Sequence, residues 1–200
     1  MKKIALTSLI AMFAFAGANA ATNYFVGGAA NLVRTDADHS TLLTVAPELG
    51  YKVDANWDVG LGLNFTYDQA WLNTNYGVDG DTYKYGLDAF ARYKVAQFGG
   101  FKLLVKGSVG MNFTTADPDV TGADTETIKT LGAAITPMIT YDVSEAFTLY
   151  ANLNFMGVRA DYTFENKDVN VPKSWAVRAF ADSSDVANTG AFQIGFNYNF

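Results

Sequence analysis

The sequence predicts an all-β fold: a transmembrane, antiparallel, up-and-down β-barrel of eight strands. Three observations carry this prediction. The chain has 200 residues, of which 15 are Phe, 11 are Tyr and 18 are Gly, and 17% are charged. Apolar residues alternate with small or polar residues in segments of about ten, which is the spacing of strands that cross a membrane. The connections between these segments are alternately long and short, as they are in membrane barrels.

The first twenty residues have the pattern of an export signal. Lys2 and Lys3 precede the apolar stretch 4–16, and Ala18-Asn19-Ala20 matches an A-x-A cleavage site. The apolar stretch is shorter than the roughly 20 residues that a transmembrane helix needs. We therefore expect residues 1–20 to be a signal peptide and residues 21–200 to form one β-barrel domain. No later apolar run reaches the length of a membrane helix, so a membrane crossing must use strands.

Each predicted strand has one uncharged apolar or aromatic face and one face of small and polar residues, because side chains alternate along a strand. The strands are expected over 23–33, 42–52, 57–67, 82–95, 101–114, 128–141, 147–158 and 191–200. In chain order, their apolar faces include Tyr24, Val26 and Leu32; Leu43, Val45 and Leu49; Trp57, Leu61 and Phe65; Tyr83, Tyr85 and Leu87; Phe101, Val105 and Val109; Leu131, Ile135 and Ile139; Phe147, Leu149, Phe155 and Gly157; and Phe192, Ile194 and Phe196.

The connections indicate which end of the barrel faces which side of the membrane. The short connections, 53–56, 96–100 and 142–146, are expected on the periplasmic side, and the long acidic ones, 34–41, 68–81, 115–127 and 159–189, on the cell surface. Aromatic residues bracket the strands at both ends and predict two girdles. Within the last loop, residues 175–180 are apolar enough for an extra hairpin or a contact patch.

The predicted inner face is rich in glycine, which suits the crowded interior of a small barrel. It also carries four charged residues, Glu48, Asp88, Arg92 and Lys106. Opposite charges that are buried together can compensate one another, so we expect these side chains to form a cluster in the lumen. The cluster could be a structural plug, or it could set the selectivity or gating of a pore.

The composition excludes several classes of function. The formal net charge is −6, so the chain has no basic footprint for nucleic acid. The sequence has no Cys and a single His, His39, which lies in the first predicted surface loop. Its neighbours Asp38 and Ser40 are adjacent along a loop, which does not make a catalytic triad. We therefore expect no catalytic residues, no cofactor and no metal site.

Three segments carry a resemblance to a known family. They are the hairpin 47–65, the run Phe90-Ala91-Arg92-Tyr93, and the terminal stretch 195–200, GFNYNF. On these segments the sequence resembles the small eight-stranded outer-membrane barrels, the porin-family group of the OmpA transmembrane domain, OmpX and OmpW-like proteins. The resemblance covers the whole chain after the signal peptide. It implies a monomer in the cell outer membrane, in contact with outer-membrane lipids and lipopolysaccharide. The alternating Phe196, Tyr198 and Phe200 resemble the signal that the barrel-assembly machinery recognises.

The resemblance implies a non-enzymatic protein that supports envelope integrity or surface interaction through its extracellular loops. The sequence identifies no surface ligand or host partner. The alternative is a narrow porin-like channel or a conduit for small hydrophobic molecules, as in the OmpW-like members. A conduit would need an apolar lumen near the loops. The inward apolar residues Phe90, Leu104, Met138 and Met156 are expected to be scattered, which does not favour a conduit. Some barrels of this kind modify lipid A with a loop His, but their His-x-Ser pattern does not occur here.

Overall fold

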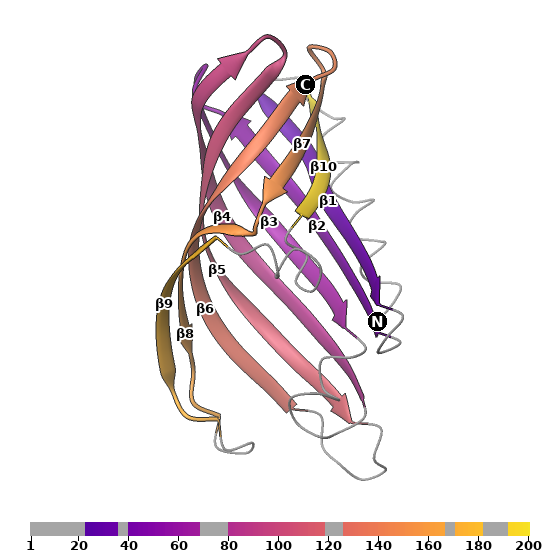
Figure 1. Cartoon of the computed structure of the whole chain (residues 1–200), viewed down its shortest axis with the longest axis vertical. Helices are drawn as coiled ribbons and strands as arrows, with labels where there is room; N and C mark the ends of the chain where they lie inside the picture. The colour runs from indigo at the N-terminus through magenta and orange to yellow at the C-terminus, as the bar shows by residue number, and fades with distance from the viewer. Residues whose placement is uncertain (1–22, 36–39, 69–79, 119–125, 167–170, 182–191) are drawn as a thin grey trace.

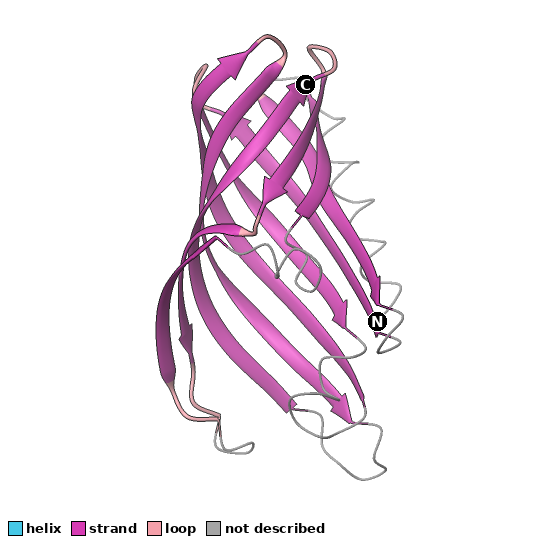
Figure 2. Cartoon of the chain, in the orientation of Figure 1, coloured by secondary structure: helices cyan, strands magenta, loops and turns pink. Residues whose placement is uncertain are grey.

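The computed structural model describes residues 23–35, 40–68, 80–118, 126–166, 171–181 and 192–200. The predicted signal peptide, 1–20, and His39 with its neighbour Asp38 lie outside these ranges. Within the described ranges, no helix is long and apolar enough to cross a membrane. Almost all of this part of the chain is β-strand (Figure 2). The first and the last strand of the chain pair with each other.

The described residues form ten strands in one antiparallel sheet (Figure 1). In chain order they are β1 (Tyr24–Thr35), β2 (Ser40–Lys52), β3 (Trp57–Asp68), β4 (Gly80–Phe98), β5 (Phe101–Pro118), β6 (Glu126–Asp142), β7 (Phe147–Leu153), β8 (Met156–Thr163), β9 (Ser174–Ala181) and β10 (Phe192–Asn199). Strands β4, β5 and β6 are longer than expected, because their hydrogen-bonded ladders continue into the segments that were predicted to be loops.

The sheet closes into a barrel. Strands β1 to β6 pair in sequence, β6 pairs with β7, β7 with β10, and β10 returns to β1. Strand β8 continues the seventh position by pairing with β6 beyond the end of β7. The wall therefore has eight strand positions, and the prediction of an eight-stranded antiparallel barrel is confirmed.

The seventh predicted strand, 147–158, is wrong as a single element. The chain turns at Asn154 and Phe155, which separate β7 from β8. Strand β7 pairs with β10, whereas β8 turns its second edge to β9. The interruption also changes which residues face outward after the turn: in β8, Val158 and Tyr162 do so rather than Gly157, whereas Leu149 of β7 faces outward as predicted. The change of phase is present in the sequence, because Met156 and Val158 are apolar at positions that a single strand over 147–158 would place on its inner face.

Gly157 explains how the chain re-enters the ladder after this turn. Its φ is +151°, a backbone conformation that other residues rarely adopt. A Cβ at this position would lie 2.3 Å from the carbonyl oxygen of Ile135 on β6. Glycine at position 157 therefore lets β8 lie close to β6, although β8 runs in a direction different from that of β7.

The last predicted loop, 159–189, contains regular structure. It holds the end of β8 and the whole of β9, which pair from Met156 with Ala181 to Thr163 with Ser174. The extra hairpin at residues 175–180 is thus formed. In Figure 1, β8 and β9 lean away from β10 toward the loop end of the barrel. The second edge of β9 has no strand partner among the residues that the structure describes.

The outer face of the barrel is apolar. Leu61 is 55% exposed, and most of the other large exposed apolar side chains occupy outward positions of the strands. Cross-strand aromatic pairs mark both ends, as the two-girdle prediction requires. At the turn end these pairs are Tyr24 with Tyr51, Trp57 with Tyr93, and Phe101 with Tyr141; at the loop end they are Tyr67 with Tyr83, and Tyr85 with Phe113.

Candidate functional site: a plug in the lumen

An ion pair between Arg92 on β4 and Glu48 on β2 occupies the lumen. The guanidinium Nη2 of Arg92 lies 2.5 Å from both carboxylate oxygens of Glu48. Arg92 is 1% exposed and Glu48 is 3% exposed, so both charges are shielded from bulk water. A buried pair of this kind is tolerated only where the remaining hydrogen-bonding groups also find partners.

Asn197 on β10 supplies some of these partners, whereas Nε of Arg92 has none among the described residues. In the amide orientation that satisfies its surroundings, its nitrogen donates to Glu48 Oε1 at 2.8 Å and to the carbonyl oxygen of Phe196 at 3.0 Å. Its oxygen accepts from Arg92 Nη1 at 3.2 Å. A neutral amide thereby bridges the acid and the base, and three strands are joined through one network.

Aromatic rings enclose the guanidinium. Its central carbon lies 4.4 Å from the ring centroid of Phe90 and 5.4 Å from the centroids of both Phe25 and Tyr150. The ammonium of Lys106 lies 4.7 Å from the Phe90 ring. Such cation–π contacts are strongest where water is excluded, so the rings stabilise the charges that they enclose.

Three of the inward aromatic rings each lie against a glycine on the neighbouring strand. We call these arrangements glycine seats: Phe25 opposite Gly50, Phe90 opposite Gly60, and Tyr150 opposite Gly195. A Cβ on the glycine would lie 2.1, 2.5 and 2.4 Å, respectively, from an atom of the ring. The glycine-rich inner face therefore provides room for the rings across the strands, as the alternation of small and large residues in small barrels requires.

The four charged residues predicted to cluster are not equivalent in the structure. Glu48 and Arg92 are in direct contact, and Lys106 reaches the pair through Phe90. Asp88 lies beside Gly62, where an added Cβ would meet its carboxylate at 3.0 Å. Among the described residues Asp88 has no ion pair within 4.0 Å, so it is not part of the central contact.

Sequence reasoning missed several members of the plug. Phe25, Tyr150 and Asn197 all occupy inward positions, and their alternation was available from the sequence. Which glycine each ring meets depends on strand register, which the alternation alone does not provide. Asp58, directly opposite Arg92 on β3, was also missed although its inward position follows from that of Trp57.

The inward apolar residues are less scattered than expected. Leu104, Met138 and Tyr150 form a buried cluster with Ala29. Leu104 and Met138 lie near the turn ends of their strands, so the cluster extends the plug toward the turns rather than lining a path near the loops. The expectation was wrong for Leu104 and Met138, because cross-strand pairing brings them directly opposite each other, whereas Phe90 and Met156 are not part of this cluster.

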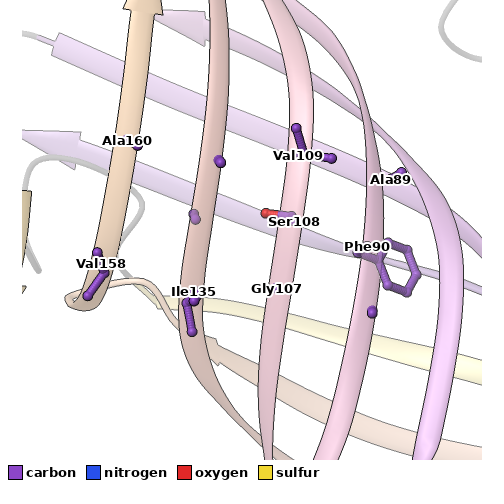
Figure 3. A pocket seen from close by; sticks show the side chains of 11 residues that line it. Ala89, Phe90, Gly107, Ser108, Val109, Ile135, Val158 and Ala160 are labelled. Carbon is purple, nitrogen blue, oxygen red and sulfur yellow. The ribbon is translucent and has the colours of Figure 1, made fainter. Parts of the chain in front are cut away.

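A shallow hollow lies outside the plug, on the outer face of β4, β5, β6 and β8 (Figure 3). Its volume is about 510 Å³, and it is lined mainly by small or apolar outward residues such as Ala91, Gly107 and Val158. It brings together no charged side chain. In the parts of the chain that are described, no group of three or more His, Asp or Glu residues could hold a metal ion. The plug is thus the one place in the described structure where buried charges and polar groups converge.

Comparison with known proteins rests on structure. No family model and no curated protein matches the sequence. The chain is similar to the crystal structure of Neisserial surface protein A, with 14% identity and a TM-score of 0.51, over 88% of this chain and 96% of that one. The fold is that of a small eight-stranded membrane barrel.

Two further solved structures show weaker similarity. One is a major outer membrane protein from Thermus thermophilus, with 16% identity and a TM-score of 0.48, over 90% of this chain and all (100%) of that one. The other is the Yersinia pestis outer membrane protein Ail, with 14% identity and a TM-score of 0.37, over 89% and 97%.

Proposed function

We propose that this chain is a non-enzymatic outer-membrane barrel protein that supports envelope integrity or surface interaction through its loop end. The plug carries this proposal. An eight-stranded barrel has an interior that side chains can fill. Here the fully buried Arg92, its partner Glu48 and three rings occupy that interior. The paired charges of this network are engaged with each other, which leaves neither to act on a substrate.

The outer face supports a place in the outer membrane. An apolar belt between two aromatic girdles matches the hydrocarbon layer and its two interfaces. Export by a signal peptide, insertion by the barrel-assembly machinery, contact with lipopolysaccharide and a monomeric state belong to the same proposal.

Among the described residues of the loop end, the hairpin of β8 and β9 is best suited to contact another molecule. Trp175 is 78% exposed and Val177 is 64% exposed on one face of β9. On the other face, Arg178 lies 3.4 Å from Asp161 of β8, and its side chain remains largely exposed. Within the described residues one edge of β9 is unpaired, and such edges readily accept a further strand. Binding residues commonly lie on segments that a rigid scaffold positions.

Single-channel conductance of the refolded protein in a planar bilayer tests the plugged state. We expect no discrete steps from the wild type and steps from Arg92→Ala, because truncation opens the space that the guanidinium fills. Val143→Ala, at an exposed turn position away from the plug, is the matched control and should stay silent. Reproducible steps from the wild type would overturn the plugged scaffold in favour of the narrow channel.

A further inference from the structure

The barrel closes where its first and last strands meet. Strand β1 pairs with β10 from Phe25 opposite Asn199 to Ala30 opposite Ile194. Unlike the turn-linked pairs, this pair has no short connection to determine its register. Period-two alternation does not determine it either, since a slip of two residues leaves every side chain on its original face.

One inward position at this closure, Gly27, lies between two members of the plug. Gly27 lies opposite Asn197 on β10 and opposite Glu48 on β2. The amide of Asn197 therefore reaches Glu48 across Gly27, and the two are joined by the 2.8 Å hydrogen bond of the plug. A Cβ on Gly27 would lie 2.3 Å from the amide of Asn197. The missing side chain of Gly27 makes the contact sterically feasible.

We propose that Asn197 fixes the register in which the barrel closes. In the observed register its amide meets both charges of the Glu48–Arg92 pair. If β10 slipped by two residues, Asn197 would lie opposite either Phe25 or Ala29, and neither position offers the open space of Gly27. Buried polar contacts specify register in other assemblies, because the wrong alignment leaves their partners unsatisfied.

The sequence of β10 predicts the direction of the error when Asn197 is lost. A slip that moves Asn197 opposite Ala29 moves Asn199 opposite Gly27. Asn199 has the same side chain, and its amide nitrogen is otherwise bonded to the carbonyl oxygen of Glu145 at 3.2 Å. In Asn197→Leu, we expect Asn199 to take the position over Gly27, so that the closure shifts by two residues in one direction.

Engineered disulfides report this register directly, because the chain has no cysteine of its own. Ala30→Cys with Ile194→Cys reports the observed register, in which the two residues are directly opposite. Leu32→Cys with Ile194→Cys reports the slipped register. All three positions are exposed and outside the plug. Directly opposite strand residues have the Cα separation that a disulfide requires, whereas diagonal neighbours are about 7–8 Å apart.

We expect the wild-type background and the matched control Asn199→Leu to form the first bond. In Asn197→Leu, the ratio of slipped to observed bond should rise by about tenfold or more, the factor expected for a buried hydrogen bond to a charged group. Formation of the first bond alone, at the wild-type ratio, would overturn the proposal.

A second variant decides the question if Asn197→Leu does not fold. Glu48→Met, Arg92→Met and Asn197→Leu together replace the whole network with apolar side chains, which leaves no buried charge of the pair without its partner. This triple variant is combined with each of the two cysteine pairs in turn. If the network fixes register, the triple variant folds and the disulfide forms with either pair. If the network serves only stability, the protein folds and forms the first disulfide alone, and the proposal is wrong.

Discussion

At the scale of single residues, we expect substitutions of a few side chains in the plug to have the largest effects on the free energy of unfolding. Arg92→Ala leaves the carboxylate of Glu48 buried without its partner. We expect a loss of about 3–5 kcal/mol in the free energy of unfolding, which is typical when one member of a buried pair is removed. Urea titration of the protein folded into lipid vesicles, followed by Trp fluorescence, measures this loss.

The double variant Glu48→Met with Arg92→Met is the control for that experiment. It removes both charges and keeps much of the volume, so its stability should lie closer to that of the wild type than Arg92→Ala does. Equal losses for the single and the double variant would contradict the view that the unpaired charge causes the destabilisation.

Glycine seats make a second prediction at this scale. Gly60→Ala places a methyl group where the Phe90 ring and the carbonyl oxygen of Leu49 now lie. Overpacking of this kind costs about 1–3 kcal/mol. Gly107→Ala is the matched control, since a Cβ there meets nothing within 4 Å. The same urea titration should show a loss for Gly60→Ala only, and similar losses for both would argue against the seats.

Residue-level prediction from sequence succeeded where face alternation was sufficient. It placed Glu48 and Arg92 on the inner face, where the structure has them in contact. It could not identify Asn197 as their third partner, because that contact crosses the junction of β1 and β10. The register of this junction depends on tertiary packing, which no local pattern encodes.

At the scale of elements, seven of the eight predicted wall strands agree with the structure in position, and the exception is informative. Apolar residues alternate over 147–155 and then change phase at Met156 and Val158, and the chain turns at Asn154 and Phe155. A turn inside an alternating segment is compatible with the pattern on each side of it. Gly157 was a local signal, because an isolated glycine inside a strand pattern often marks an irregularity.

Gly157 also carries a prediction for the element that follows it. Gly157→Ala adds a Cβ at a φ of +151° and close to the carbonyl oxygen of Ile135. Strain of about 1–3 kcal/mol is expected, and it should weaken the pairing of β8 with β6. Hydrogen exchange measures this effect directly.

Exchange should accelerate in β8 and at positions 130–135 of β6, which pair with β8. Positions 138–142 of β6 pair with β7 and serve as the internal control. Uniform acceleration along β6 would indicate a general loss of stability instead of local release of β8.

At the scale of the whole molecule, the exposed apolar belt makes the stability of the fold depend on a surrounding lipid bilayer. Leu61→Arg puts a charge on the lipid-facing surface of β3 and should cost about 2–4 kcal/mol near the middle of the bilayer. Val143→Arg, at an exposed turn, should cost about 0–1 kcal/mol. Folding yield and urea stability in lipid vesicles compare the two. Equal tolerance of both substitutions would favour a soluble sandwich over a membrane barrel.

The fold class was predictable because a bilayer imposes the same requirement on every strand that crosses it. Backbone groups must be paired in a closed wall, and outward side chains must be apolar. These constraints act on pattern rather than on residue identity, which explains how a chain with 14% identity to Neisserial surface protein A has its fold. The alternating chemistry was sufficient to predict the barrel, whereas the particular plug depended on register.

The glycine seats have a consequence for how this interior can change. Phe25 on β1 fills the volume above Gly50 on β2, so neither residue can be replaced freely while the other stays. Exchanging the two residues would leave the filled volume nearly unchanged and move the ring to the adjacent strand. A survey of single substitutions would therefore score both positions as intolerant, whereas a survey of reciprocal pairs would find them exchangeable. The barrel interior can then diverge by compensated exchange across strands while its outline stays constant.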